Sequence, residues 1–429
     1  MSKLFWQRNF RGMGFSEFLH SDVIFPQLLS FSVCLYRHLL ASFSRDILLY
    51  LFFSDGMSFF KLPHDYSTPN VHVTYTSVPV PNSTVILGTD IYTYQPTSSS
   101  MASYTESALP RKTISSTDSK DTAGQIAEQQ MPSSGGASNP WGNVKPTLGV
   151  VIAHPYPPLG GSKADGVVRY LANRFISALG SAVVVYAFNF RGVTTRTSWT
   201  SKTEQQDMLS VADAMITAYS SSIRTVLLVG YSYGALIASK VAVDSSEMLG
   251  QEVDVALWLI SPPLWPACGV LTLSLRARDS EPQFYKFVGK VKLRQVATLP
   301  AAAANASPDG RVLVVYGTSD SFTRTGRFQK WIKVQYTRIS EEFPGFDANA
   351  STSGNDSMVS VVEVDGGSHF WKQEDLDMIW DNDTVQRFLS KVSGTTLATS
   401  SEETGSGAGS GASSVVDSDR LIGNNKWED

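Results

Sequence analysis

The stretch TVLLVGYSYGALIASKVA, residues 225–242, decides the fold class because two hydrophobic patterns meet in it at a single serine. The apolar run that begins at Thr225 is typical of a buried strand in a parallel sheet. After the sequence GYSYG, small and apolar residues recur with a helical period. A G-x-S-x-G string also arises by chance, so the strand before it and the helix after it carry the interpretation. Together they predict a serine, Ser232, held exposed on a sharp strand-to-helix turn.

The same alternation of strand and helix runs through most of the chain. Further apolar runs are LGVVIAH, AVVVYAFNF, VDVALWLIS, RVLVVYGTSD and VSVVEVDGG, and helical patterns cover residues 165–180 and 204–220. Two strands at 71–80 and 84–96, joined by the turn PNS, precede them. The pattern predicts an α/β fold whose mostly parallel central sheet has about eight strands, with helices on both faces. In such sheets ligands bind at the carboxyl ends of the strands.

Composition divides the chain into segments. Residues 1–60 form an apolar N-terminal extension, residues 61–392 the α/β domain, and residues 393–429 a Gly/Ser-rich tail. Within the domain, residues 97–146 are rich in Ser and Thr and have little hydrophobic periodicity, so we expect a disordered insertion there. We expect the same of the tail.

The N-terminal extension allows several interpretations. Its apolar runs fall short of the ~20 residues that a membrane-spanning helix needs, and the first lies too far from Met1 for a signal peptide. In order of preference, the extension is an amphipathic segment in peripheral contact with a membrane, an extension with no fixed role, or a membrane anchor. We expect a cytoplasmic protein, with a membrane-associated or mitochondrial location as alternatives.

Charge and cysteine content exclude several function classes. The formal net charge is −4, and no basic stripe indicates nucleic-acid binding. The two cysteines do not suggest a disulfide framework or a metal site. We therefore expect no cofactor, no metal ion and no nucleic-acid partner, and a small acyl compound as substrate. The oligomeric state stays open.

Ser232 needs a base to become a nucleophile. Of the six histidines only His369 follows Ser232 in the chain, just past the last strand. The base in turn needs a carboxylate to fix its tautomer. Asp320 ends the preceding strand and Asp365 is the rival acid; we prefer Asp320, because a loop after a separate strand can reach the far imidazole nitrogen. The order Ser, Asp, His is that of α/β-hydrolase triads.

A tetrahedral intermediate also needs hydrogen-bond donors for its oxyanion. The N–H of Tyr233, directly after the nucleophile, is one candidate. The other should come from the loop HPYPPLGGSKADG after the strand at 148–153. Its prolines have no N–H, so Tyr156 is the natural second donor.

These pieces together resemble the α/β-hydrolase superfamily. HPYPPLGGS, FNFRGV, GYSYGA, GTSDSF and GGSHFW are similar to the corresponding motifs of small, nearly capless hydrolases related to dienelactone hydrolases and prolyl-oligopeptidase-like esterases. The resemblance covers residues 71–96 and 147–391. It implies Ser232, Asp320 and His369 as nucleophile, acid and base, and Tyr156 and Tyr233 at the oxyanion hole. The segment TTRTSWTS, which follows FNFRGV, departs from the pattern.

The leading hypothesis is therefore a serine hydrolase that cleaves an ester or similar small acyl bond through an acyl-enzyme. Two alternatives stay open: an acyltransferase that uses the same residues, and a non-catalytic α/β-hydrolase scaffold that binds a protein partner, because fold alone does not fix function.

Overall fold

The computed structural model describes residues 70–95, 145–195, 197–198, 200–220, 222–248, 253–265, 267–271, 281–298, 311–343 and 358–395. All of them belong to one compact unit that spans Phe60–Asp429. The apolar extension, most of the Ser/Thr-rich insertion and almost all of the tail lie outside the described residues, so the expectations for them remain predictions.

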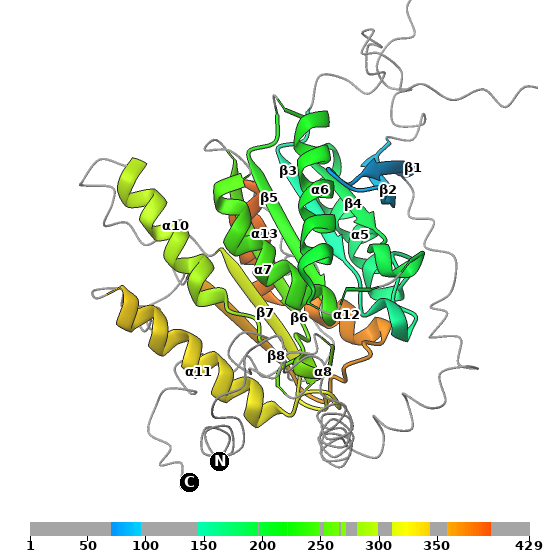
Figure 1. Ribbon diagram of the computed structural model, residues 1–429. Coiled ribbons are helices and arrows are strands. Elements are labelled where there is room, and N and C mark those ends of the chain that lie inside the picture. Colours follow the sequence, from blue (N-terminus) through cyan, green and yellow to red (C-terminus); the bar gives the residue numbers. More distant parts are fainter. Residues whose placement is uncertain are drawn as a thin grey trace, which may run out of the picture. The chain divides into compact units, whose positions relative to one another are not determined.

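A central sheet of eight strands organises this unit, in the order β1-β2-β4-β3-β5-β6-β7-β8 (Figure 1). Strands β3 to β8 run parallel to their neighbours, whereas the β1–β2 hairpin pairs antiparallel within itself and with β4. The expectation of a mostly parallel sheet is confirmed. The strands are β1 Val71–Pro79, β2 Ile86–Tyr94, β3 Leu148–Ala153, β4 Val183–Phe188, β5 Thr225–Tyr231, β6 Asp254–Ile260, β7 Val312–Gly317 and β8 Val359–Val364.

Helices connect the parallel strands. The α-helices are α5 Gly166–Leu179, α6 Lys202–Ala218, α7 Tyr233–Met248, α8 Ala267–Leu271, α10 Phe284–Thr298, α11 Thr325–Glu342, α12 Gln373–Trp380 and α13 Asp383–Ser393, and the short 3-10 turns are η2 Pro157–Leu159, η3 Gly180–Ala182 and η4 Arg191–Val193. Helix α5 illustrates how sequence fixes an element. The Asp165 side chain caps its first turn by accepting from Val167 N at 2.9 Å, and Gly180, with φ 55°, ends it.

Helices cover both faces of the sheet. One apolar core holds side chains of α6, α7, α10 and α11 against alternate residues of the parallel strands. The other holds α5, α12 and α13 against the remaining alternate residues, with Trp258 of β6 at 0% exposure among Phe175, Trp380 and Phe388. Because both faces are buried, β3 to β7 read as continuous apolar runs.

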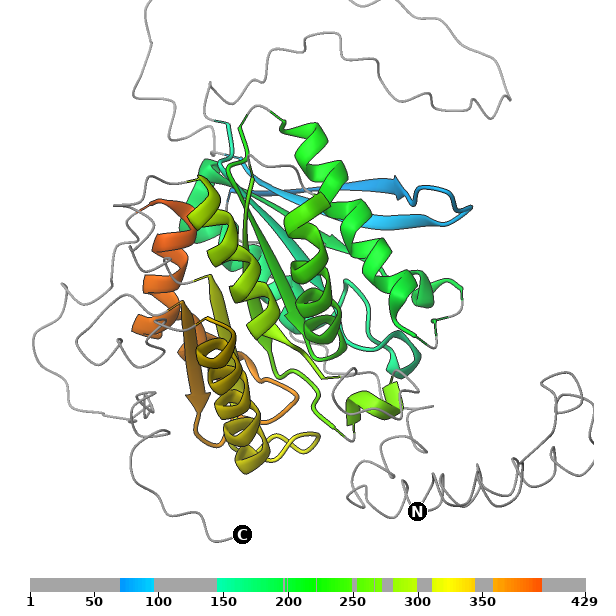
Figure 2. The same cartoon turned by 60° about the vertical axis from the view of Figure 1, so that its left-hand side comes forward.

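The sheet ends at the hairpin on one side and at β8 on the other (Figure 2). Strand β1 is exposed along most of its length, and Val73, Tyr75 and Ile86 of the hairpin are among the exposed large apolar residues. Among the described residues, none of the helices has the length and hydropathy required to cross a membrane.

Candidate active site

Ser232 occupies the turn between β5 and α7, and its backbone has φ 55°. This left-handed conformation is costly for a residue with a Cβ, so neighbouring structure must hold it in place. The N–H of Ser232 donates to the carbonyl of Ile260 at 2.9 Å. A Cβ added at Gly230 would lie 2.3 Å from the carbonyl oxygen of Gly234. Gly230 is therefore required for the turn to close.

His369 lies beyond the carboxyl end of β8, and its imidazole contacts the serine directly. The distance from Ser232 Oγ to His369 Nε2 is 2.8 Å. The ring is 3% exposed and packs 4.3 Å from the ring of Phe322. The hydroxyl of Tyr231 donates to the backbone carbonyl of His369 at 2.8 Å, which holds the histidine loop against the end of β5.

Asp320, after β7, completes the chain of hydrogen bonds. Its Oδ2 lies 2.8 Å from His369 Nδ1, and its Oδ1 accepts from the N–H groups of Phe322 and Thr323. A neutral imidazole that carries its proton on Nδ1 satisfies both the serine and the aspartate. The rival carboxylate, Asp365, instead accepts from Thr318 Oγ1 at 3.1 Å and is exposed.

Backbone hydrogen bonds join the loop after β7, which carries Asp320, to the loop after β8, which carries His369. Ser319 N donates to the carbonyl of Gly367 at 2.9 Å, and Thr318 N donates to that of Val364 at 3.0 Å. A Cβ at Gly317 would lie 2.0 Å from the carbonyl oxygen of Gly367. This close approach leaves the two loops little freedom to move apart.

The other two predicted residues, Tyr156 and Tyr233, also lie next to each other. Their rings meet edge to face with centroids 4.9 Å apart. Gly234 packs so closely on the end of β3 that a Cβ there would lie 2.2 Å from the carbonyl oxygen of Ala153. Within the described part of the chain, neither backbone N–H of these two tyrosines has a hydrogen-bond acceptor. Both are available to a ligand.

Asp165, the cap of α5, is an acidic group that the sequence reasoning did not single out. Burial raises its pKa to about 6, opposed by hydrogen bonds from the N–H groups of Val167 and Val168 and by the charge of His369. Asp165 is thus an acidic group near the histidine of the site.

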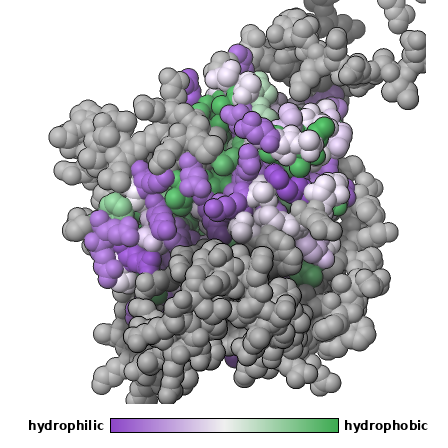
Figure 3. All heavy atoms as spheres, viewed as in Figure 1, coloured by the Kyte–Doolittle hydropathy of each residue, from purple (hydrophilic) through white to green (hydrophobic). Residues whose placement is uncertain are grey.

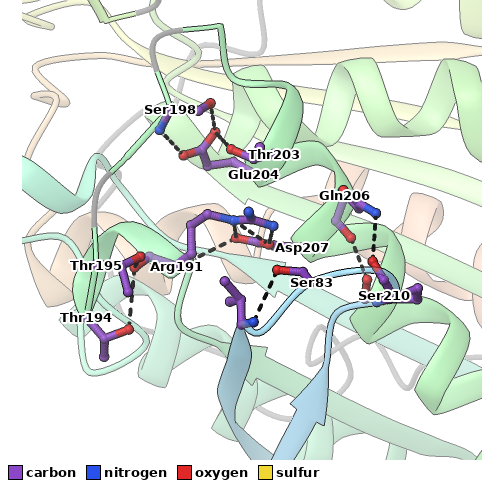
Figure 4. A network of polar contacts seen from close by, with 12 residues as sticks. Ser83, Arg191, Thr194, Thr195, Ser198, Thr203, Glu204, Gln206, Asp207 and Ser210 are labelled. Carbon is purple, nitrogen blue, oxygen red and sulfur yellow. Dashed lines mark hydrogen bonds and ion pairs between the residues drawn. The ribbon is translucent and has the colours of Figure 1, made fainter.

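Figure 4 shows a polar cluster around Arg191, Asp207 and Glu204, and the charge of Glu204 contributes to the raised pKa of both Tyr156 and Tyr233, after burial. Arg191, in η4, donates to both oxygens of Asp207 on α6, with Nη2 to Oδ1 at 2.5 Å. Glu204, one turn earlier, accepts from Ser198 N at 2.6 Å and from the Ser198 hydroxyl. Both carboxylate side chains are fully buried. They hold Arg191, which precedes the segment TTRTSWTS (194–201) that departs from the resembled motif, and Ser198 within that segment.

A polar cleft of about 370 Å³ lies elsewhere, between the starts of α6 and α10 and one side of α7. Figure 3 shows hydrophilic residues gathered in this region. The cleft is lined by Thr200, Lys202, Gln205, Ser239, Lys240, Val243, Asp244, Glu281, Gln283 and Lys286. None of the predicted site residues lines it.

His154 is a second residue that the sequence reasoning missed. It directly follows β3, its ring is 0% exposed, and burial lowers its pKa to about 3. Its position at the carboxyl end of a strand would have marked His154 as a candidate site residue. The search for a base, restricted to histidines after Ser232, passed over it.

A serine on a left-handed turn after a parallel strand, hydrogen-bonded to a histidine from a later strand end, defines the α/β-hydrolase class. A model of the alpha/beta hydrolase family matches residues 150–375, more than half of the 429 residues. The chain belongs to this family, which confirms the superfamily and the fold expected from the sequence. No curated protein matches the sequence.

Several solved structures are similar to the chain. A lidless α/β serine hydrolase of Xanthomonas campestris has 16% identity and a TM-score of 0.40, over 75% of this chain and 94% of that one. An α/β serine hydrolase homologue of Coxiella burnetii has 18% identity and a TM-score of 0.38, over 71% and 93%. An esterase of Pyrococcus furiosus has 12% identity and a TM-score of 0.40, over 75% and 93%.

Proposed function

We propose that the protein is a serine hydrolase that cleaves an ester or a similar small acyl bond. The observation that carries the proposal is the continuous hydrogen-bonded chain from Ser232 Oγ through both nitrogens of His369 to Asp320 Oδ2, with 2.8 Å at each contact. A strained serine next to a base that is itself oriented by a carboxylate is the arrangement that nucleophilic catalysis requires.

The mechanism follows from this geometry. Ser232 Oγ forms a bond to the substrate carbonyl carbon while His369 Nε2 takes the hydroxyl proton. The oxyanion accepts hydrogen bonds from the N–H groups of Tyr156 and Tyr233. The intermediate collapses as His369 returns the proton to the leaving group. Water, deprotonated by His369, then releases the acid from Ser232, while Asp320 stabilises the imidazolium in each step.

A fluorophosphonate probe tests the proposal. We expect the wild-type protein to be labelled, with mass spectrometry of its peptides locating the adduct on Ser232, and the Ser232→Ala variant to resist labelling. Ser239→Ala is the matched control, because Ser239 lies on α7, the helix that follows Ser232, and its hydroxyl donates to Leu236 O. It should label like the wild type. A folded wild-type protein that is not labelled would contradict the proposal.

Hydrolysis of 4-nitrophenyl esters of increasing acyl length then measures the acyl preference. Product analysis in the presence of added alcohols or amines separates hydrolysis from acyl transfer, since transfer gives the new ester or amide. Absence of turnover on the panel, together with a stable protein partner that co-purifies, would favour the scaffold alternative.

A further inference from the structure

The ring of His154 joins two strand-end loops beside the proposed oxyanion hole. Its Nε2 lies 3.0 Å from Phe190 N, in the loop after β4, and its Nδ1 lies 2.6 Å from the carbonyl oxygen of Pro155. A backbone N–H can only donate, so Nε2 must accept from Phe190. The proton of the neutral ring is then on Nδ1, which donates to Pro155 O.

The acceptor of this second bond belongs to the peptide that carries the Tyr156 N–H. Pro155 C=O and Tyr156 N–H are the two polar groups of a single planar unit, and in a trans peptide they point in opposite directions. A hydrogen bond that holds the carbonyl therefore also aims the N–H. It also draws electron density toward the carbonyl oxygen, which makes the N–H a stronger donor.

The next peptide is fixed as well. The Tyr156 carbonyl accepts from Leu159 N at 3.1 Å and from Gly161 N at 3.2 Å. Gly161 approaches so closely that a Cβ there would lie 2.3 Å from Pro155 O. The peptides on both sides of the Tyr156 Cα are thus held, while its own N–H stays available.

We propose that His154 is a positioning residue of the oxyanion hole. It relays polarisation along a hydrogen-bond chain that runs from Phe190 N–H, through its imidazole, to the Pro155–Tyr156 peptide and the Tyr156 N–H. This inference rests on the proposed function, because only a reaction with an oxyanion uses that N–H. Burial lowers the pKa of His154 to about 3, so the ring stays neutral and keeps this donor and acceptor pattern at neutral pH.

Three substitutions separate the two bonds of the ring. His154→Asn keeps a donor near the position of Nδ1, His154→Gln keeps an acceptor near that of Nε2, and His154→Phe keeps the ring shape without either bond. His72→Asn, at an exposed position of β1, is the matched control for a histidine-to-asparagine change.

The readouts are kcat and KM for 4-nitrophenyl acetate and the inhibition constant of phenylboronic acid, whose serine adduct mimics the tetrahedral intermediate. We expect His154→Phe and His154→Gln to lower kcat by about 10- to 100-fold, less than the loss of a whole oxyanion donor. KM should change by less than about twofold, because the hydrogen bond from the Tyr156 N–H to the substrate oxygen strengthens mainly in the transition state. The inhibition constant should rise by a factor similar to the loss in kcat. The kcat of His154→Asn should stay within about fivefold of the wild-type value. The kcat of His72→Asn should equal the wild-type value.

A merely structural role for His154 predicts a different result. The Asn and Gln variants would then lose activity equally, with the loss spread over KM and thermal stability; this outcome, or a Gln variant with wild-type kcat, overturns the inference. If the Phe variant does not fold, the Asn and Gln pair still decides. A wild-type protein that is not labelled by fluorophosphonate overturns the proposed function and this inference together, whereas a labelled wild type with insensitive variants overturns the inference alone.

Discussion

At the residue scale, Asp320 uses its two carboxylate oxygens for different partners. Oδ1 accepts two backbone N–H groups of its own loop, and Oδ2 faces His369 Nδ1. An asparagine can keep the first pair of bonds only by keeping its carbonyl oxygen at the Oδ1 position. Its NH₂ group then faces His369, and the imidazole proton must move to Nε2. Ser232 loses its acceptor.

We therefore expect Asp320→Asn to lower kcat by about 10³- to 10⁴-fold while the protein stays folded. The measurement is ester hydrolysis at neutral pH together with circular dichroism. Asp365→Asn is the matched control, because Asp365 is exposed and bonds Thr318 instead of the histidine. If Asp365→Asn lost as much activity as Asp320→Asn, the assignment of the acid would be wrong.

His154 makes the stability of the folded protein depend on pH. Its pKa falls from the ordinary 6.5 to about 3 on burial, so between these values the unfolded chain binds a proton that the folded chain does not. The free energy of unfolding therefore falls as pH is lowered through this window, by up to about 1.4 kcal/mol per pH unit, and the full stability is present above 6.5.

We expect the wild-type protein to lose about 1.4 kcal/mol more than His154→Gln between pH values of about 7.5 and 5.5, measured by urea unfolding at each pH. Asp165, whose pKa burial raises to about 6, changes stability in the opposite direction. It is present in both proteins and cancels from the difference. If the free energy of unfolding changed equally with pH in the two proteins, His154 would have to take up a proton in the folded protein within this range.

At the element scale, the close contact between α7 and β3 positions the serine relative to the Tyr156 turn. Gly234 is the second residue of α7, and a Cβ there would lie 2.2 Å from Ala153 O. Gly326 holds the same position in α11, where nothing lies within 4 Å of an added Cβ. The two glycines therefore make a matched pair for substitution by alanine.

Gly234→Ala should destabilise the protein by about 1–3 kcal/mol, because the helix must move off the strand. It should also lower kcat, since the turn that carries Tyr156 moves with β3. Gly326→Ala should change stability by less than about 1 kcal/mol, and in the stabilising direction. Thermal and urea unfolding with ester hydrolysis measure both effects. Equal effects of the two substitutions would contradict the tight contact.

The eight strands and the helices α5, α6 and α7 were predicted from the sequence, because their signals are local, whereas α10 and α11 were not. Every strand expected from an apolar run is present, and α5 ends at Gly180 as expected. The buried cluster of Arg191, Asp207 and Glu204 was not readable. Its charged residues look like solvated positions until the fold places η4 against α6. Burial of these charges depends on how the two segments pack, which the sequence pattern of either segment alone does not predict.

At the scale of the whole molecule, the sheet order brings the site together. The carboxyl ends of β3, β5, β7 and β8 supply Tyr156, Ser232, Asp320 and His369. The rule that ligands bind at these ends allowed the candidates to be chosen from the sequence. The strand order and the tilt of each loop depend on contacts between distant segments, so the hydrogen bonds of His154 to Phe190 N and Pro155 O emerged only from the structure.

The sheet register also bears on the insertion between β2 and β3. Tyr92 pairs with Val185 of β4, so continuing that register brings Tyr94 level with Val183, which pairs with Leu148 on its other side. Neighbouring strands lie about 4.8 Å apart, so the end of β2 and the start of β3 are separated by only about 10 Å. A short linker can span this distance.

Replacing residues 97–143 with a Gly/Ser linker of about four residues should therefore leave kcat and KM unchanged. The disorder expected from the sequence of the insertion predicts that this replacement stabilises the domain by about 1 kcal/mol, because closing a shorter loop costs less entropy. Ester hydrolysis and thermal unfolding measure the two effects, with a scrambled insertion of unchanged length as the control. The scrambled protein should match the wild type in both. A lower melting temperature in the shortened and scrambled proteins alike would instead show that the natural insertion packs against the domain through its specific sequence.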